Sequence, residues 1–334
     1  MVTGASGRLG GRLVQRLVAD GHDVRGLARS AAAEAAVAGT GAAPVRGSLT
    51  DPASLDTAVG GCEVVVHCAG VVGSSSRRQP YAVNISGTEN VIAAARAGGV
   101  SRLVHVGAAM SLLGGRRPIL DADESWPINE PGFSGYAASK TVAERAVHAA
   151  SSPSLSTVVI RPGWVWGDLA DPQAEATADA VRVGRMRLID GGGHRIVTSH
   201  IDNTVGALCQ ALDHGRPGGS YFVFDEGTVT LADFLSQLMG TYGLTLPRAS
   251  MPGPLAGVLA RAMDLGWRVA RRPGDPPVSR LLVALNAGPF VVSDALARQE
   301  LGYRPAISRA EGMTALYEAR RSQSEPQGRS AAPA

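Results

Sequence analysis

The chain has 334 residues, of which 45% are hydrophobic, and a net charge of only +3, a composition typical of a globular protein with a sizeable core. Its arginines are scattered and aromatic residues make up 4% of the chain, which argues against a nucleic-acid-binding surface. The three cysteines, Cys62, Cys68 and Cys209, have no metal-ligand spacing and form no paired framework, so we expect no metal site and a cytoplasmic location.

Short β-branched runs alternate with helical stretches through the first half of the chain. The expected strands are 23–28, 63–69, 102–109 and 156–162, and the expected helices are 11–20, 54–60, 87–99 and 139–150. This alternation predicts an α/β fold, a doubly wound parallel (Rossmann) sheet with helices on both faces. Beyond about residue 168 the regularity weakens, which indicates a smaller C-terminal substrate-binding region. The polar stretch 320–334 is predicted to be a disordered tail.

A glycine loop opens the chain, in the sequence TGASGRLG. Gly4, Gly7 and Gly10 stand between a short strand and a helix. Glycines there permit a tight turn and close approach to a pyrophosphate, which the free N–H groups and dipole of the helix start would bind. Because the motif begins at residue 2, we expect no signal peptide. The position of the loop at the head of an α/β pattern predicts a dinucleotide site.

The next strand ends in Arg29 and Ser30 where NAD-binding proteins usually place a carboxylate for the ribose hydroxyls. An arginine suits a 2′-phosphate instead, and Arg8 in the glycine loop is a second candidate for that contact. We therefore expect NADP, with NAD as the alternative. We assign 1–167 and 196–226 to an NADP-binding Rossmann domain, and 168–195 and 227–319 to the substrate-binding region.

The sequence YAASK contains Lys140, the only lysine of the chain, four residues after Tyr136. That spacing places both on one face of a helix. A neighbouring ammonium and an oxidised nicotinamide would lower the pKa of the phenol, which is ordinarily about 10. The same amine can donate to ribose hydroxyls, which predicts a tyrosine acid/base tuned by lysine.

These motifs clearly resemble the extended short-chain dehydrogenase/reductase family over nearly the whole chain, and most of all its 3β-hydroxysteroid dehydrogenase-like branch within the NAD-dependent epimerase/dehydratase group. The stretches that carry the resemblance are TGASGRLG, VVHCAG (65–70), NISGTENV (84–91), YAASK, RPGWVWG (161–167), SHIDN (199–203) and SDALARQELGYRP (293–305). It implies an oxidoreductase with a small-molecule substrate and a possible homodimer.

The resemblance also implies site residues. The pyrophosphate would be wrapped by Gly4, Ser6, Gly7, Arg8, Leu9 and Gly10. The adenosine end would meet Arg29, Ser48 and Leu49, and the cofactor beyond the fourth strand would be lined by Cys68, Ala69 and Gly70. The nicotinamide would pack by Pro162, Gly163, Trp164 and Val165, with Tyr136 and Lys140 beside it. Asn84 would either support a proton relay or pack its helix, and His200 and Asp202 would have a structural role.

One position departs from the family pattern. Such enzymes use a Ser or Thr hydroxyl at the end of the fifth strand to hold the reacting oxygen, and Ala109 stands there. Strand alternation would place Ser111 on the same face, about 6–7 Å further on, where a loop adjustment brings its hydroxyl to the substrate. A substrate hydroxyl, a water or another side chain are the alternatives.

The leading hypothesis is an NADP-dependent oxidoreductase that interconverts a ketone and a secondary alcohol on a moderately hydrophobic, sterol-like or secondary-metabolite substrate, with Tyr136, Lys140 and Ser111 as the catalytic residues. An epimerase or dehydratase with retained dinucleotide and a non-catalytic dinucleotide sensor are the alternatives.

The apolar stretch 254–272, broken by Arg261, Asp264 and Arg268, is too interrupted for stable membrane insertion and predicts an amphipathic helix. We expect it to pack into the core or the substrate pocket, with a membrane-surface contact as the alternative.

Overall fold

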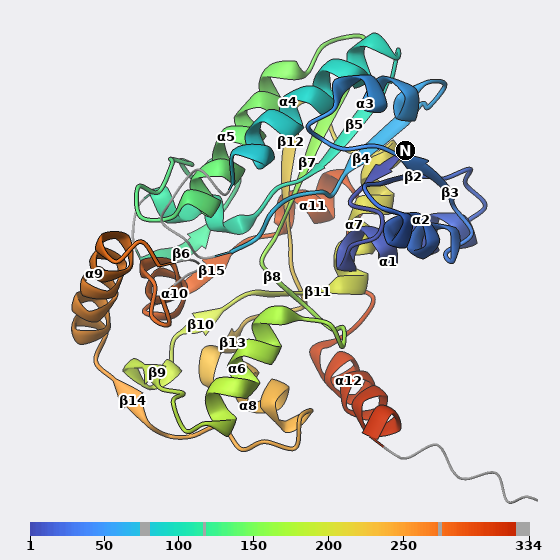
Figure 1. Cartoon of the computed structure of the whole chain (residues 1–334). Helices are drawn as coiled ribbons and strands as arrows, with labels where there is room; N and C mark the ends of the chain where they lie inside the picture. Colours follow the sequence, from blue (N-terminus) through green and yellow to red (C-terminus); the bar gives the residue numbers. More distant parts are fainter. Residues whose placement is uncertain (74–80, 116–117, 273–275, 325–334) are drawn as a thin grey trace, which may run out of the picture.

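A computed structural model describes residues 1–73, 81–115, 118–272 and 276–324. Its main element is a seven-stranded sheet in the order β12-β7-β5-β4-β1-β2-β3, and every neighbouring pair in it is parallel (Figure 1). The strands are β1 (Val2–Thr3), β2 (Arg25–Ala28), β3 (Ala43–Arg46), β4 (Val64–His67), β5 (Arg102–Val106), β7 (Ser156–Pro162) and β12 (Gly219–Val223). The predicted doubly wound α/β fold is confirmed.

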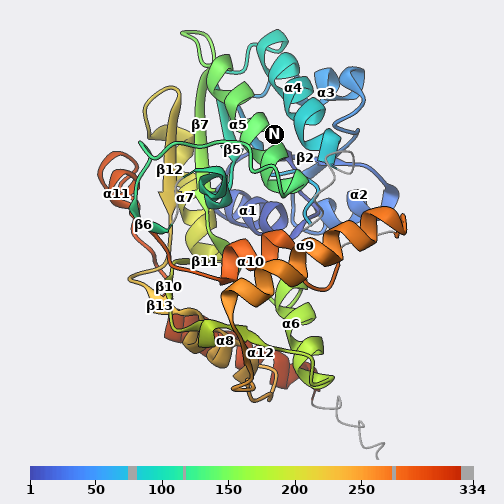
Figure 2. The same cartoon turned by 90° about the vertical axis from the view of Figure 1, so that its left-hand side faces the viewer.

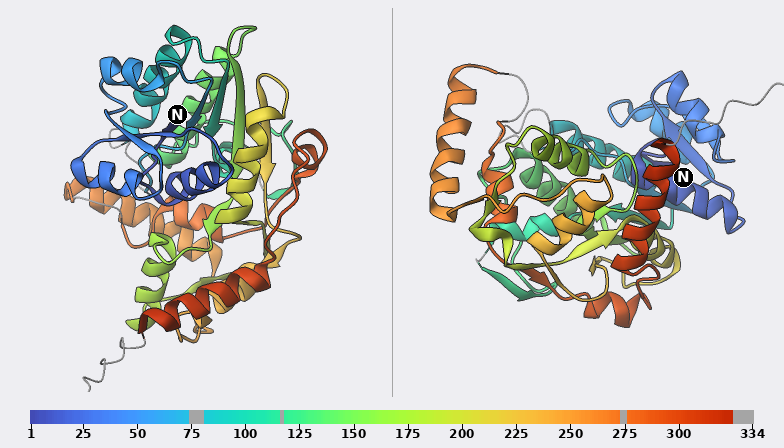
Figure 3. Two further views of the ribbon diagram at one scale, coloured as in Figure 1. Left: turned by 90° about the vertical axis from the view of Figure 1, so that its right-hand side faces the viewer. Right: turned by 90° about the horizontal axis from the view of Figure 1, so that it is seen from below.

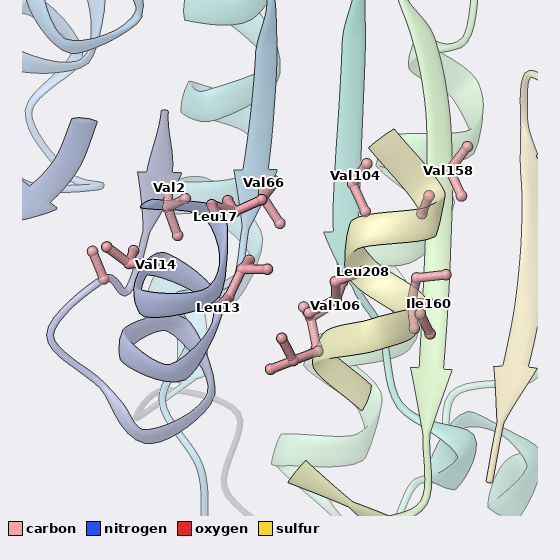
Figure 4. Close-up of a cluster of buried hydrophobic side chains, with 14 of the residues drawn as sticks. Val2, Leu13, Val14, Leu17, Val66, Val104, Val106, Val158, Ile160 and Leu208 are labelled. Atoms are coloured by element: carbon pink, nitrogen blue, oxygen red, sulfur yellow. The ribbon is translucent and has the colours of Figure 1, made fainter. Parts of the chain in front are cut away.

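Helices cover both faces of this sheet because consecutive strand residues point to opposite sides. Val66, Val104 and Val158 face one core, whereas the adjacent Val65, Leu103 and Val159 face the other. The first core is closed by α1 (Arg8–Ala19), α2 (Ala31–Ala38), α7 (Ile201–Asp213) and α11 (Ala295–Glu300). Figure 4 shows Leu13, Val14 and Leu17 of α1 and Leu208 of α7 in this core. The second core is closed by α3 (Pro52–Val59), α4 (Ala82–Ala97) and α5 (Gly135–Ala150).

A smaller region lies beside the carboxyl ends of the large sheet (Figures 1 and 2). Its strands are β6 (Ile119–Ala122), β10 (Arg195–Ile196), β13 (Val229–Thr230) and β15 (Phe290–Val292), with two strand pairs made by β8 (Trp164–Trp166) and β11 (Thr198–His200), and by β9 (Leu188–Ile189) and β14 (Ser250–Met251). Its helices are α6 (Pro172–Arg182), α8 (Leu231–Gly240), α9 (Gly253–Val269), α10 (Arg280–Asn286) and α12 (Arg309–Ser324).

The two regions share strand β12. Tyr221 and Val223 belong to the core under α7, while Phe222 lies in the core of the smaller region with Trp166 and Phe234. The segment around Tyr303, late in the chain, returns to the large sheet. There the hydroxyl of Tyr303 donates to the carbonyl of Phe224 at 2.8 Å. The predicted division into two domains by residue ranges stays a prediction.

The disordered tail predicted for 320–334 begins too early, because residues 320–324 are still helical. Helix α12 continues to Ser324, because Arg320 pairs with Glu175 at 3.3 Å and lies over the ring of Tyr242 at 3.5 Å. Residues 325–334 lie outside the described part of the chain. Within the described residues, no helix is both long and apolar enough to cross a membrane.

Candidate active site

The glycine loop joins β1 to α1 and is shaped by close backbone contacts. A Cβ at Gly4, whose φ is +69°, would lie 2.9 Å from the backbone of Ala69, and a Cβ at Gly10 would lie 2.1 Å from the carbonyl oxygen of Gly4. No side chain caps the start of α1 at Gly7, and Ser6 and Gly7 are exposed. An uncapped helix start, preceded by an exposed loop of small residues, fits the pyrophosphate of a dinucleotide.

The segment after β4 contacts this loop. Cys68 and Ala69 are half-buried and Gly70 is exposed, and the backbone N–H of Ala69 donates to the hydroxyl of Thr3 at 3.2 Å. Asn84 of α4 holds the segment by accepting from the N–H of Val71 at 2.7 Å.

The amide group of Asn84 is fully used in these contacts. Its Nδ2 donates to the carbonyl of Val71 at 2.9 Å and to the hydroxyl of Ser139 at 3.0 Å. With both amide hydrogens engaged, Asn84 ties the loop after β4 to α5. The geometry favours this positioning role over the proton relay.

Helix α5 carries Tyr136 in its first turn and Lys140 one turn later. The hydroxyl of Ser134 caps the helix by accepting from the N–H of Ala137 at 3.1 Å. Tyr136 is half-buried and its ring lies 5.7 Å from that of Tyr81, whereas Lys140 is buried and its Nζ donates to the carbonyl of Val106 at the end of β5. The spacing of four therefore brings both groups to the carboxyl ends of β4 and β5.

Burial dominates the electrostatics of this pair in the protein alone. Burial, with a smaller contribution from Tyr81, raises the pKa of Tyr136 to about 12, and burial lowers the pKa of Lys140 to about 8 against the opposing contributions of Glu144 and Cys68. The amine is turned to the carbonyl of Val106, and the lowering of the phenol pKa expected with a bound nicotinamide stays a prediction. In the protein alone, the lysine is the more strongly activated of the two groups.

A buried ion pair lies one turn further along α5. Glu144 is fully buried and accepts from Nε of Arg161 at 2.8 Å, while His148 lies 3.4 Å from the same carboxylate. Burial alone would raise the pKa of Glu144, yet His148 and Arg161 hold it below its ordinary value. The pair fixes α5 to β7, the strand that leads into Pro162.

A cavity of about 260 Å³ is lined by Tyr136 and by the predicted nicotinamide residues. Its walls are mostly apolar, with polar groups at Arg8, Asp171, Gln173 and Asn286. The side chains and glycines that line it include Ala109, Met110, Pro162, Gly163, Trp164, Val165, Ile196, Val197, Leu231, Leu285 and Phe290. A second, more open groove of about 380 Å³ near α12 includes none of the predicted site residues.

Ser111 does not occupy the predicted position. Strand β5 ends at Val106, and Ala109–Gly114 forms a 3-10 helix, so strand alternation does not apply. Ala109 and Met110 line the cavity, whereas Ser111 is fully buried outside the lining and its Oγ has no hydrogen-bond partner. No serine or threonine of the described residues lines this cavity.

Arg8 is held away from the adenosine end. Its Nε donates to both carboxylate oxygens of Asp168, at 3.0 and 2.8 Å, and its Nη1 lies 3.6 Å from Asp171. These contacts with two carboxylates do not favour the suggestion that Arg8 meets a 2′-phosphate, which stays a prediction. Arg8 instead joins the glycine loop to the segment after β8, at the cavity, a contact that the sequence pattern did not predict.

The predicted adenosine end comprises β2, β3 and the loop after β3. Arg29 is exposed at the end of β2, and its carbonyl accepts from Arg46, which also pairs with Glu34 at 2.7 Å. Arg46 was missed because the short strand that carries it, APVR, has no clear β-branched pattern. Its register opposite Ala28 brings a second arginine to this end.

The remaining predicted residues fall in two places. Leu49 is buried against α4, where Asn90 donates to its carbonyl at 2.8 Å, and Ser48 is half-buried beside it. His200 caps the start of α7 by accepting from the N–H of Asp202, whose carboxylate pairs with Arg12 of α1 at 2.6 Å. His200 and Asp202 therefore hold α7 in place.

Comparison with curated proteins gives relatives along almost the whole chain. The chain is 36% identical over 321 residues to a 4-hydroxy-2-methyl-3-oxo-4-farnesyl-3,4-dihydroquinoline-1-oxide ketoreductase of Stigmatella aurantiaca, covering 95% of both chains. It is 33% identical to a 2-alkyl-3-oxoalkanoate reductase of Stenotrophomonas maltophilia, covering 95% of this chain and 97% of the relative.

Solved structures share the fold at lower identity. The UDP-glucose 4-epimerase of Thermotoga maritima, solved with UDP-glucose, superimposes with a TM-score of 0.76 at 17% identity, over 97% of this chain and 99% of the other. A short-chain dehydrogenase/reductase superfamily protein of Agrobacterium tumefaciens with bound NAD has a TM-score of 0.71 at 22% identity, over 96% and 97%.

The family model of the 3-beta hydroxysteroid dehydrogenase/isomerase family matches residues 1–252, which include the glycine loop, the Tyr136–Lys140 helix and the cavity wall at 162–165. The chain belongs to the 3-beta hydroxysteroid dehydrogenase/isomerase family and is an NAD(P)-dependent oxidoreductase of the extended short-chain dehydrogenase/reductase type.

Proposed function

We propose that the protein is an NADP-dependent reductase that interconverts a ketone and a secondary alcohol on a moderately hydrophobic substrate. The observation that carries this proposal is the mostly apolar cavity that contains Tyr136, with Lys140 buried one turn behind it. A cavity of this kind suits an apolar substrate whose one carbonyl is held at a polar point.

The chain's own residues supply binding and proton transfer. Gly4, Gly7 and the start of α1 would hold the pyrophosphate, and Lys140 would donate to the ribose. The dinucleotide, when bound, would supply or accept the hydride. Tyr136 gives a proton to the substrate oxygen in reduction, and takes it back in oxidation.

Proton transfer from a phenol of pKa about 12 is weak acid–base catalysis at neutral pH. Release of the Lys140 ammonium from the carbonyl of Val106 would place a positive charge nearer the phenol. We infer that this rearrangement accompanies loading of the site and brings the pKa of Tyr136 toward the working pH.

The relatives' names support the substrate class. Both the Stigmatella and the Stenotrophomonas relatives are named for reduction of 3-oxo compounds that carry an alkyl or farnesyl group. We extend this to the present chain as a proposal, because Met110, Ile196, Leu285 and Phe290 give its cavity a comparable apolar surface.

Because Ala109 replaces the usual Ser or Thr, two alternative functions are considered. An epimerase or dehydratase would oxidise and re-reduce its substrate with a retained dinucleotide, and a sensor would bind the dinucleotide without turnover. The alanine favours the sensor, since it cannot donate a hydrogen bond to the reacting oxygen. Tyr136, in the cavity beside that alanine, favours a reductase.

The test is oxidation of NADPH with a panel of hydrophobic 3-oxo compounds, by wild type and by Tyr136→Phe. We expect turnover by wild type and a loss of about 10²–10⁴-fold in kcat/KM for the variant, with NADPH binding unchanged. Equal inertness of both proteins toward every ketone, with NADPH bound, would support the sensor instead. Dinucleotide that copurifies and is not consumed would support the epimerase.

A further inference from the structure

Helix α9 has an apolar stripe that faces away from the protein. Figures 2 and 3 show α9 at the edge of the molecule, and it contacts the rest of the chain through Ala256, Ala260 and Asp264, which are buried. On the opposite side, residues spaced by three and four are exposed: Leu255 (54%), Val258 (61%), Ala262, Leu265 (60%) and Val269 (76%). This spacing places them along one line of the helix, over about 20 Å.

Exposed large apolar side chains are concentrated at α9 and α10. Of the ten large apolar side chains that are exposed in the described residues, five lie on α9 and the adjoining α10: four on α9, and Leu282 on α10. The amphipathic helix is confirmed, and Ala256 and Ala260 on one side of it are buried as packing requires. The apolar stripe on the other side lies in neither the core nor the cavity lining. A contiguous exposed apolar face of this kind marks an interaction site.

The charges around the stripe are all positive. Arg261 and Arg268 follow one flank of the apolar line, and Arg271 and Arg272 stand at its end, all exposed. The one acidic residue of α9, Asp264, is on the buried side. Among the described residues, the outer face of this helix therefore joins apolar side chains to arginines with no carboxylate between them.

This face adjoins the cavity. Helix α10 packs against α9, and its Leu285 and Asn286 line the cavity while Leu282 is exposed. An apolar surface bound at α9 would thus lie next to one wall of the candidate active site.

The charge pattern distinguishes the possible occupants. Pairing of α9 with α9 of a second copy would bring arginine toward arginine, and such like charges destabilise helix pairs. Spanning of a bilayer is excluded by the length and charge of the helix. An interfacial helix, with its apolar side in the acyl boundary and its arginines at anionic headgroups, satisfies both features.

We propose that the α9 face formed by Leu255, Val258, Leu265 and Val269, with the arginines beside it, binds the surface of an anionic lipid bilayer. The binding is peripheral and reversible. The inference does not depend on the proposed reaction, because it concerns a different surface.

The experiment is flotation of the full chain with vesicles of phosphatidylglycerol and phosphatidylcholine (1:1), beside vesicles of phosphatidylcholine alone. We expect the wild type to float with the anionic vesicles at low salt and to be released by 0.5 M salt. Leu265→Gln with Val269→Gln should reduce the partition coefficient at least about tenfold, and Arg261→Gln with Arg271→Gln by about fivefold per arginine.

Two substitutions serve as matched controls. Val183→Gln removes a similarly exposed valine (63%) beyond α6, and Arg16→Gln removes a surface arginine of α1; both should float as wild type does. Thermal unfolding of each variant verifies that it is folded.

Three outcomes would overturn the proposal. The wild type could stay with the buffer, or float equally with neutral vesicles, or keep its vesicle binding in the Leu265→Gln, Val269→Gln variant. Light scattering adds a further criterion: if that variant changes the protein from dimer to monomer and the wild type does not float, the face is an interface between copies.

Discussion

The two predicted ends of the dinucleotide site differ in how far their charged groups are exposed to water. At the nicotinamide end, Lys140, Glu144 and Arg161 are buried, and desolvation contributes most to the pKa shifts of Lys140 and Tyr136. At the adenosine end, Arg29 is exposed and the Arg46–Glu34 pair is open to solvent. Charges without water interact strongly and charges in water weakly, so we expect substitutions at the first end to have much larger effects.

A Glu→Gln substitution at each end gives the largest expected difference between buried and exposed ion pairs. Glu144→Gln leaves the Arg161 guanidinium buried without its carboxylate, and we expect a loss of about 3–5 kcal/mol in the free energy of unfolding. Glu34→Gln removes the partner of Arg46 at the surface and should cost less than about 1 kcal/mol. Urea unfolding of both variants measures the difference, and similar losses would contradict the contrast.

The next prediction separates stability from activity at Lys140. Burial lowers the pKa of its ammonium from 10.5 to about 8, which corresponds to about 3 kcal/mol of destabilisation when the amine is charged. Lys140→Met should therefore raise the free energy of unfolding of the dinucleotide-free protein at pH 7, by up to that amount, while reductase activity is lost.

The pH dependence follows from the direction of this shift. Between pH 8 and pH 10.5 the folded protein has released the Lys140 proton and the unfolded chain still binds it, so wild-type stability rises with pH in that window relative to Lys140→Met. Urea unfolding at pH 7, 8.5 and 10 gives the comparison. A constant difference between the two proteins would show that the lysine is not buried as an amine.

The third prediction concerns Ala109, at the predicted nicotinamide end. Its side chain lines the cavity with Tyr136, and a serine there would present a hydroxyl to the reacting oxygen. A single donor of this kind is worth about 10²–10³-fold in rate. We expect Ala109→Ser to raise kcat/KM by about 10–100-fold on a ketone without a neighbouring hydroxyl.

A substrate with a hydroxyl next to its carbonyl supplies its own donor and provides the control. On such a ketone Ala109→Ser should change kcat/KM by less than about threefold. The Stigmatella relative is named for a compound with a 4-hydroxy group beside the 3-oxo group, which motivates this pair of substrates. Equal gains on both ketones would mean that the missing donor is not replaced by the substrate.

The sequence predicted the parts of the molecule that depend on local periodicity. Val65 and Val66, or Val158 and Val159, reveal a strand buried on both faces, and the glycine loop reveals the turn before α1. The four predicted strands and four predicted helices are all present, with ends shifted by up to five residues.

Long-range contacts decided what the sequence could not show. Arg8 meets Asp168 at a separation of 160 residues, which no local pattern indicates. Ser111 was misplaced because the chain leaves the strand at Val106 and turns as a 3-10 helix. The pKa of Tyr136 depends on where the Lys140 amine points, and a spacing of four residues gives the helix face but not that direction.

The last prediction concerns the predicted adenosine end, where it bears on the choice of dinucleotide. Arg29 and Arg46 lie at the ends of β2 and β3, and the guanidinium of Arg46 already contacts the carbonyl of Arg29. We propose that both arginines meet the 2′-phosphate of NADP, although Glu34 pairs with Arg46 and competes for it. One charge-assisted contact in water is worth about tenfold in affinity, so Arg29→Ser with Arg46→Ser should weaken NADPH binding by about 10–100-fold and NADH binding by less than about threefold.

Glu34→Gln should act in the reverse direction, because it frees Arg46 and removes a negative charge. Fluorescence titration with both dinucleotides measures these ratios, and a wild-type preference for NADH would assign this end to NAD.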